Sequence, residues 1–356
     1  MSLTRAVRTL VEESIRRAGG WLPFDRFMAL ALYAPGLGYY ANHSRKFGRM
    51  PSSGSDFVTA PEMTPLFGQA LAAQVADALQ ATQTDEVWEF GAGSGALALQ
   101  LLGALDASVR TYTIVDLSAT LRERQREVLG GFARKVRWVS ELPPRLRGVV
   151  VGNEVLDAMP VKLLVRTRGI WHERGVGPGL QWVDRATDLR PPLDIEGSHD
   201  YLTEIHPQAE AFVRTLADRL ERGAAIFLDY GFPEREYYHP QRHMGTLMCH
   251  RGHLADADPL ADPGVKDITA HVNFTGLALA AQESGLSVLG YTSQGRFLIN
   301  CGLAALLANA PMDQRIAGQR LLAEHEMGEL FKVIAFHAGP FWDAQGFSQG
   351  DRTERL

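Results

Sequence analysis

Helical and strand patterns alternate along much of the chain, and this alternation limits the folds that it can adopt. Residues 61–160 show helical patterns at 64–79, 96–105 and 119–129, separated by strand patterns at 86–90, 111–116, 136–139 and 148–153. The alternation resumes with helical patterns at 208–220, 275–284 and across 295–325, and with strand patterns at 224–228, 286–291 and 332–336. A β-α-β-α-β order is typical of a parallel sheet covered by helices. The sequence therefore predicts an α/β fold with a mostly parallel sheet and helices on both of its faces.

Three stretches depart from this pattern. Residues 1–63 combine an opening helix, a second apolar segment at 24–33 and a loop rich in Gly, Pro and Ser at 35–59. Residues 161–203 hold short alternating runs broken by Gly-containing turns, which predicts an antiparallel excursion. Residues 232–275 are irregular, rich in His, Pro and Gly, and too long for a plain connection. We therefore expect an N-terminal cap at 1–63 and a main domain at 64–356, with insertions at about 161–203 and 232–275.

Composition excludes several classes of protein. The chain of 356 residues has 36 Lys and Arg against 41 Asp and Glu, and its net charge of −5 argues against general nucleic-acid binding. Its apolar stretches are interrupted, as at Gln100, well before the ~20 residues of a membrane span. Two cysteines, Cys249 and Cys301, are too few for a disulfide scaffold or a four-cysteine zinc site. The opening segment is rich in Arg, but Glu12 and Glu13 speak against a transit peptide, and we expect a cytoplasmic protein.

The sharpest local motif is the sequence Glu-Phe-Gly-Ala-Gly-Ser-Gly at residues 89–95, which joins a strand pattern to a helical one. This is the context that a nucleotide-binding loop requires. Gly91 and Gly93 allow a tight turn with a ligand against the backbone, and Gly95 lets the helix start close to the sheet. Asp116, about twenty residues further on, ends the next strand pattern, where a carboxylate can accept both ribose hydroxyls. The loop and this acid together predict a site for an adenosyl ligand.

Two cofactors compete for this site. Read as Gly91-x-Gly93-x-x-Ala96, the loop fits the dinucleotide pattern, and NAD would then be the cofactor. An ionised Glu89 directly before the loop would repel a pyrophosphate at close range. The same carboxylate would attract the amine and the sulfonium of S-adenosylmethionine. We therefore favour the methyl donor over the dinucleotide, and a glycine-rich turn without a ligand is the structural alternative.

A polar cluster follows the strand pattern at 148–153. Asn153, Glu154 and Asp157 fall at the carboxyl end of that strand, where open α/β sheets bind their ligands. Two carboxylates in this place suit a cationic acceptor such as a guanidinium, whose planar fork makes paired contacts. The structural alternative is an acid pair that caps a following helix.

Two further segments carry candidate functional residues. Asp229 and Tyr230 follow another apolar strand pattern and are candidates for the site. The alternative is that they only form a turn at the end of that strand. His271 is a candidate hydrogen-bonding group or proton acceptor near neutral pH, with a core histidine as the alternative. We predict no metal site, because the zinc-ligand residue types between 239 and 253 lack paired spacing. These residues are His239, His243, Cys249, His250 and His253.

The order of the motifs along the chain resembles the MidA family of class I methyltransferases. That family includes the mitochondrial protein arginine methyltransferase that assists the assembly of respiratory complex I. The matching stretches run from about residue 22 to about residue 302; each is weak alone, and together they are specific. They are Leu32-Tyr33 with Gly38-Tyr39-Tyr40, 56–62 with Phe67-Gly68, 89–95, Gln125, Asn153-Glu154 with Asp157 and Pro160, 229–231, Thr246-Leu247, His253, 267–274 and 294–298.

The resemblance implies a Rossmann-like class I methyltransferase fold with S-adenosyl-L-methionine as the cofactor. It also implies that the loop around Gly54, Asp56, Thr59 and Glu62 folds over the cofactor site. Asp116 departs from the family, which more often has Glu there, and the shorter arm should still reach the ribose hydroxyls. The other residues that the resemblance assigns to the cofactor are Glu89, Gly91, Gly93, Gly95, Leu117, Asn153 and Glu154.

The paired acids and the resemblance together predict methylation of an arginine in a protein partner, with a complex I-type subunit as the acceptor that the family implies. Glu154 and Asp157 would orient the guanidinium. Asp229, Tyr230 and His271 would shape the acceptor pocket, and His271 or water would take the released proton. Two alternatives stay open: methylation of another small-molecule or protein acceptor, and a cofactor-binding assembly factor without catalysis. The sequence predicts no nucleic acid and no membrane insertion, and it leaves a homodimer open.

Overall fold

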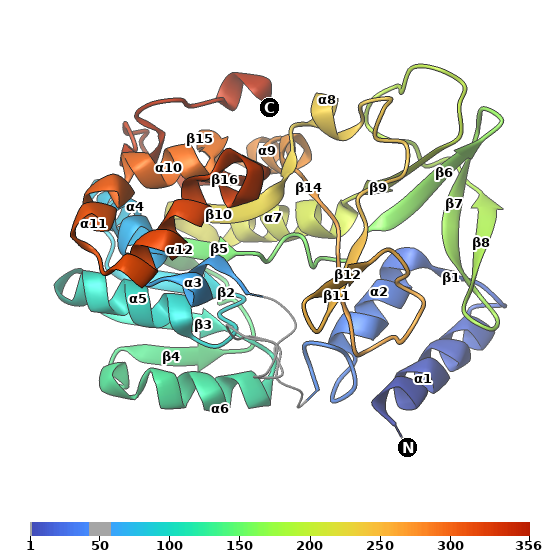
Figure 1. Ribbon diagram of the computed structural model, residues 1–356, viewed down its shortest axis with the longest axis horizontal. Helices are drawn as coiled ribbons and strands as arrows, with labels where there is room; N and C mark the ends of the chain where they lie inside the picture. Colours follow the sequence, from blue (N-terminus) through green and yellow to red (C-terminus); the bar gives the residue numbers. More distant parts are fainter. Residues whose placement is uncertain (1, 43–57) are drawn as a thin grey trace.

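The computed structural model describes residues 2–42 and 58–356, and at its centre lies an eight-stranded sheet (Figure 1). The strand order is β15-β16-β10-β5-β2-β3-β4, and β14 pairs with β10. Among the paired strands of this sheet, β16 runs antiparallel to β10 and β15, and the pairs from β10 to β4 are parallel. The strands are β2 (Glu86–Phe90), β3 (Thr111–Val115), β4 (Val136–Val139), β5 (Leu146–Asn153), β10 (Leu220–Phe232), β14 (Val272–Asn273), β15 (Ser287–Ser293) and β16 (Phe331–Ala338).

Helices cover both faces of the sheet, as the alternating pattern predicts. Neighbouring residues of β5 point to opposite faces: Val149 and Val151 pack in one apolar cluster and Val150 in another. The first cluster is covered by α4 (Leu66–Thr82), α5 (Ala96–Leu105), α10 (Gln294–Asn300), α11 (Leu303–Asn309) and α12 (Met312–Leu322). The second is covered by α7 (Pro207–Arg219) and α9 (Phe274–Glu283), while α6 (Ala119–Val128) lies beside β4 at the edge of the sheet (Figure 1). The expected α/β fold is confirmed.

A second lobe lies beside the sheet and is built from three distant parts of the chain (Figure 1). A shared apolar cluster holds it together, with Val7 from the N-terminal residues, Leu163 and Val176 from the first insertion, and Cys249 and Ile268 from the second. Its helices are α1 (Leu3–Arg17) and α2 (Phe24–Tyr33). Its strands are β1 (Leu22–Pro23), β6 (Lys162–Thr167), β7 (Ile170–Gly177), β8 (Gln181–Ala186), β9 (Tyr201–Ile205), β11 (Met248–Arg251), β12 (Leu254–Asp256) and β13 (Asp267–Thr269).

Two segments differ from the sequence-based expectation. The antiparallel excursion is confirmed, but it gains β9, which pairs with β6 and joins it to the start of α7. Residues 232–275 are not wholly irregular, because they contain α8 (Glu234–Tyr237) and the antiparallel strands β11, β12 and β13. These strands are only three or four residues long, which is too short to show a period-two pattern in the sequence. No helix among the described residues is long and apolar enough to cross a membrane.

The order of the strands in the sheet determines where a ligand site can form. The chain enters the sheet at β2, continues outward on one side to β3 and β4, and then returns to β5 on the other side of β2. Helices that leave neighbouring strands in opposite directions open a crevice at the carboxyl ends of those strands. The glycine loop follows β2 at this point, and Asn153 ends β5 beside it.

Candidate functional site

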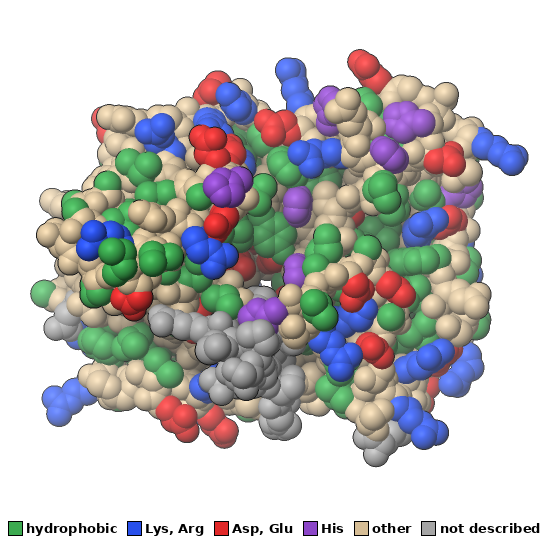
Figure 2. Space-filling view, in the orientation of Figure 1, with side chains coloured by type: hydrophobic (Ala, Val, Ile, Leu, Met, Phe, Trp, Pro, Cys, Tyr) green, Lys and Arg blue, Asp and Glu red, His purple; other side chains and the backbone are tan. Residues whose placement is uncertain are grey.

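One cavity of about 980 Å³ lies at the carboxyl ends of β2, β3, β5 and β10, between the sheet and the second lobe. Figure 2 shows the face on which the two lobes meet, hollowed near its centre. Its lining includes most of the expected site residues, namely Thr59, Glu62, Glu89, Gly91, Gly93, Asp116, Leu117, Asn153, Glu154, Asp157, Tyr230 and His271. Gly95 and Asp229 do not line it, and Gly54 and Asp56 lie outside the described residues.

The glycine loop depends on backbone conformations that side chains disfavour. Gly91, Gly93 and Gly95 have φ angles of 65°, 51° and 88°, in the left-handed region that glycine adopts without strain. A Cβ added to Gly91 would lie 2.7 Å from Cγ2 of Val155. The backbone of the glycine loop therefore packs directly against the loop that follows β5.

Glu89 lies at the base of this loop and is only 1% exposed. The Tyr112 hydroxyl donates a hydrogen bond of 2.7 Å to its Oε2. Burial raises the pKa of Glu89 to about 8, in spite of that hydrogen bond. Without a cation beside it, this carboxyl is therefore mostly neutral at pH 7, in contrast to the ionised group expected from the sequence. A cation placed beside it would favour the ionised form.

The raised pKa of Glu89 has a consequence for stability. An acid with a higher pKa in the folded state binds its proton more tightly there, so stability falls as the pH rises between the two values. We expect the unfolding free energy of the protein without added cofactor to fall between pH 5 and pH 8, with at most about 1.4 kcal/mol per pH unit from this group. Urea unfolding of the wild type and of Glu89→Gln at pH 5, 6.5 and 8 measures this. Equal pH slopes in the two proteins would contradict the expectation.

Asp116 and the glycine loop are held by one buried side chain, Gln125 of α6. Its Nε2 donates to Asp116 Oδ2 at 2.9 Å and to the carbonyl oxygen of Gly93 at 3.0 Å. The Trp138 indole donates to Oε1 of Gln125 at 2.9 Å and fixes the amide. Sequence reasoning gave Gln125 no role beyond its place among the motifs of the resemblance, because its burial on a mostly polar helix is seen only in the structure. Gly95 lies beside Gln125, and its φ of 88° favours glycine at this position.

Two hydrogen bonds hold the segment around Pro61 and Glu62 against the glycine loop and α5. The Ser94 hydroxyl donates a hydrogen bond to the Glu62 carboxylate, and the Gln100 amide donates to the carbonyl oxygen of Pro61 at 2.8 Å. Both acceptors belong to α3 (Ala60–Met63), and Thr59 precedes it. Thr59 and Glu62 thus reach the cavity, as the resemblance implies.

The loop after β5 is shaped by Asp229. Glu154 has a φ of 54°, a left-handed conformation that is costly for a residue with a side chain. Oδ2 of Asp229 accepts hydrogen bonds from the amides of Val155, Leu156 and Asp157 at 3.1, 2.9 and 3.3 Å. Asp229 is only 1% exposed and lies behind the loop. It therefore orients the acids of this loop and does not form the cavity wall, which corrects the expected placement.

Glu154 and Asp157 present their carboxyl groups to the cavity. The Asn153 amide donates to Glu154 Oε1 at 3.0 Å, and the Tyr230 hydroxyl donates to Asp157 Oδ2. Asp157 Oδ1 and Asn153 Oδ1 are buried without a hydrogen-bond partner among the described residues. Burial raises the pKa of Glu154 to about 8 and that of Asp157 to about 6. The lining therefore keeps two carboxyl groups and unused acceptor atoms for a cationic hydrogen-bond donor.

A further acidic residue of the cavity, Asp267, was not singled out from the sequence. It is 3% exposed, it lines the cavity, and the Tyr40 hydroxyl lies 2.9 Å from each of its oxygens. The Tyr40 ring stacks on Tyr33 at 5.6 Å, and the Tyr33 hydroxyl donates to the carbonyl oxygen of Ala158 at 2.8 Å. The second lobe thus contributes rings and an acid to the site.

His271 completes the ring-lined side of the cavity. The centroid of its ring lies 5.2 Å from the ring centroids of Tyr230 and Phe232. The ring centroids of Phe331 and Tyr230 are 5.3 Å apart. Nδ1 of His271 is buried without a hydrogen-bond partner among the described residues. Burial, with Arg242 and Lys332 nearby, lowers the pKa of His271 to about 4. The imidazole is therefore neutral at pH 7 and is a weak proton acceptor.

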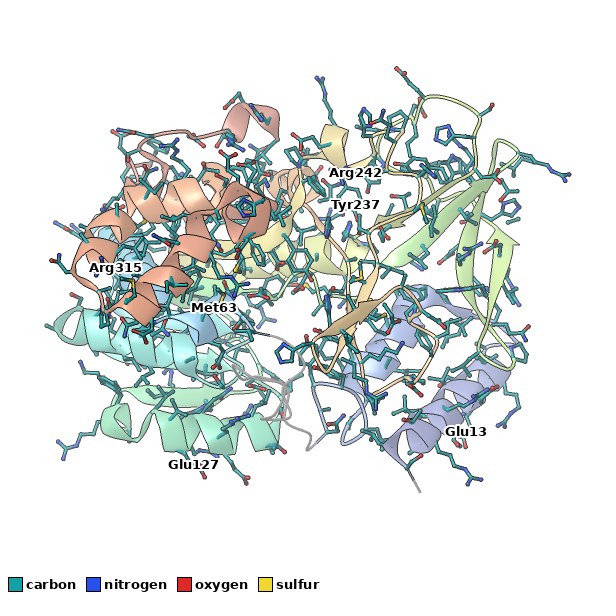
Figure 3. The ribbon with its side chains drawn as sticks, in the orientation of Figure 1. Glu13, Met63, Glu127, Tyr237, Arg242 and Arg315 are labelled. Atoms are coloured by element: carbon teal, nitrogen blue, oxygen red, sulfur yellow. The ribbon has the colours of Figure 1, made fainter. Side chains whose placement is uncertain are left out.

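Glu204 holds the second insertion in place from outside the cavity. Its carboxylate accepts hydrogen bonds from the amides of Thr246 and Leu247 at 2.8 and 3.2 Å, and from the Tyr237 hydroxyl at 2.9 Å. Tyr237 ends α8, and Arg242 follows in the same connection (Figure 3). Thr246 lines the cavity, whereas Glu204 does not. Among the described residues, no group of three or more His, Cys, Asp or Glu side chains is placed to hold a metal ion.

Comparisons with known proteins agree with this architecture. A family model described as "Putative S-adenosyl-L-methionine-dependent methyltransferase" matches residues 70–292. A Burkholderia thailandensis protein, crystallised with S-adenosyl-homocysteine, is 49% identical over 99% of this chain and 97% of its own, with a TM-score of 0.95. The mitochondrial protein arginine methyltransferase NDUFAF7 of Danio rerio is 28% identical, covering 89% of this chain and 84% of its own. The Drosophila melanogaster homologue is 27% identical, covering 90% and 82%.

The residues of the cavity fit an S-adenosyl donor. Gly91 and Gly93 of the glycine loop line the cavity, Asp116 offers an acidic side chain directly after β3, and Glu89 and Glu154 suit a cationic ligand. Asn153 Oδ1 adds a buried acceptor without a partner among the described residues. The matched family covers more than half of the chain, and the fold is that of class I methyltransferases. The chain therefore belongs to the MidA family of S-adenosyl-L-methionine-dependent methyltransferases, and its cofactor is S-adenosyl-L-methionine.

Proposed function

We propose that this protein transfers a methyl group from S-adenosyl-L-methionine to an arginine side chain of a protein partner. The observation that carries the proposal is the paired Glu154 and Asp157 carboxyl groups at the tip of β5, directly beside the glycine loop. A guanidinium has several N–H donors in one plane and matches such a pair of carboxylates. Among the described lining residues there is neither Lys nor Arg, so no lining Lys or Arg side chain opposes a cationic acceptor.

The cofactor would be held by the half of the cavity formed by β2, β3 and the glycine loop. We assign the ribose hydroxyls to Asp116, the cationic end to Glu89 and Asn153, and the apolar contact near the adenine to Leu117. Thr59 and Glu62 would cover this half from the N-terminal side. When bound, the cofactor supplies a methyl group carried on a positively charged sulfur.

The acceptor would be held by the other half of the cavity. Glu154 and Asp157 would orient the guanidinium so that one nitrogen faces the cofactor half. Holding the two reacting groups in line lowers the barrier of a displacement reaction. Tyr230 would keep the Asp157 carboxylate in place through its hydroxyl. The rings of Tyr230, Phe331 and His271 would exclude water around the acceptor nitrogen.

The acceptor nitrogen loses a proton as it gains the methyl group. Asp157 is better suited than His271 to take that proton, because burial raises the pKa of Asp157 to about 6, whereas that of His271 is lowered to about 4. Oδ1 of Asp157 has no hydrogen-bond partner among the described residues and is the atom that would receive it. His271 would then act as a neutral wall residue, in place of the expected transfer of the proton to His271 or water.

The relatives support the arginine specificity of this proposal. Several mitochondrial proteins that this chain resembles over about nine-tenths of its length are named protein arginine methyltransferases. Their sequences are 26–28% identical to this chain. A subunit of a respiratory complex I type is the acceptor class that the motif resemblance suggests.

The experiment uses the purified full chain with a methyl-labelled donor and peptides that differ at one position. We expect label on a peptide that contains one Arg and none on the same peptide with Lys, because the ammonium cannot make the paired contacts of a guanidinium. Label on a small molecule of a cell lysate, with no peptide or protein labelled, would contradict the arginine assignment. Cofactor binding without any labelled product would favour a cofactor-binding assembly factor.

A further inference from the structure

Charge is distributed unevenly between the depth and the mouth of the cavity. Six acidic side chains line it, each of them buried or half-buried, and a cation placed among them favours their ionised forms. The described lining residues that are exposed are all uncharged. The six acids are Glu62, Glu89, Asp116, Glu154, Asp157 and Asp267. A cation is therefore attracted to the interior, whereas the described mouth offers no charge to a segment that crosses it.

Three exposed apolar side chains mark the mouth of the acceptor half. They are Tyr33, Met248 and Leu330, which are 42%, 38% and 51% exposed and all line the cavity. Met248 is the register partner of Thr269 in the β11–β13 pair, and Thr269 also lines the cavity. Leu330 directly precedes Phe331, the ring that packs on Tyr230. We call these three side chains the apolar rim.

We propose that the protein selects an arginine whose neighbours in the partner's sequence are apolar. This inference rests on the proposed function and defines the class of substrate more narrowly. As the guanidinium enters, the residues on either side of it would lie across the apolar rim and bury apolar surface against it. Acidic neighbours would be repelled by the carboxylates behind the rim, and basic neighbours would find no partner among the described residues of the mouth.

The experiment compares peptides of equal length that carry one Arg flanked on both sides by Leu, by Ser or by Asp. Binding is measured by fluorescence anisotropy with S-adenosyl-homocysteine present, and methyl transfer is measured separately. We expect the Leu-flanked peptide to bind at least about tenfold more tightly than the Ser-flanked peptide, and the Asp-flanked peptide to bind most weakly. The double variant Met248→Ser, Leu330→Ser should lose most of the preference for Leu over Ser.

A matched control is Ile170→Ser, at a residue that is 63% exposed, lies at the start of β7 and does not line the cavity. It should keep the preference of the wild type, and all three proteins should bind S-adenosyl-homocysteine equally. Equal affinity of the wild type for the Leu- and Ser-flanked peptides would overturn the inference, whether or not either is methylated. A clear preference for binding the Leu-flanked peptide, without methyl transfer to any peptide, would support the role of the apolar rim and reject the proposed function.

Discussion

Replacing Asp157 with Asn is expected to lower kcat/KM for an arginine peptide by about 100-fold or more, because a buried cation that loses its partner costs several kcal/mol. Asp157 is 5% exposed, its Oδ1 has no hydrogen-bond partner among the described residues, and its other oxygen is held by Tyr230. The amide keeps the shape of the carboxyl group but neither the charge nor the ability to take a proton. Initial-rate measurements with labelled donor give the change.

Two further measurements separate a role at the acceptor from a general loss of structure. Affinity for S-adenosyl-homocysteine should stay within about threefold of the wild type, a difference of less than 1 kcal/mol. The wild-type kcat/KM should fall as the pH drops through about 6, where burial places the pKa of Asp157, and the Asn variant should lack this fall. Wild-type activity in Asp157→Asn would reject the assignment of this residue to the acceptor.

The central sheet could be predicted from the sequence because its signals are local. The strand patterns at 86–90 and 136–139 coincide with β2 and β4, and the helical pattern at 96–105 coincides with α5. The glycine loop and Asp116 follow directly from these strands, since parallel strands bring their carboxyl ends to one edge. For the same reason, Glu154 and Asp157 could be placed beside the glycine loop before any distance was known.

The remainder of the site depends on long-range packing that no local pattern reports. Tyr40 meets Asp267 across 227 positions of the chain, within a lobe that three separate segments build together. The placement of Asp229 behind the loop could not be read from its position at the end of β10, because a strand end fixes the edge of the sheet and not the direction of one side chain. The protonation of Glu89 likewise depends on burial, which the glycine motif does not specify.

Replacing Gly91 with Ala is expected to weaken binding of S-adenosyl-homocysteine by about 100-fold, or nearly 3 kcal/mol. The φ of 65° is strained for any residue with a side chain, and the new Cβ would lie 2.7 Å from Cγ2 of Val155. Relief requires either the glycine loop or the loop after β5 to move. The first would displace backbone that faces the cofactor, and the second would displace Glu154, which directly precedes Val155. Isothermal titration calorimetry gives the loss of affinity.

Gly103→Ala is the matched control, because Gly103 lies within α5 and a Cβ there would meet nothing within 4 Å. Alanine in a helix is favoured over glycine by roughly 1 kcal/mol, so this variant should be as stable as the wild type or more stable and should bind the cofactor normally. Gly91→Ala should unfold at lower urea concentration and yet remain folded in buffer. Unchanged affinity in folded Gly91→Ala would show that the two loops can separate without disturbing the cofactor. In that case, the close contact between Gly91 and Val155 would not be what joins the cofactor half of the cavity to the acceptor half.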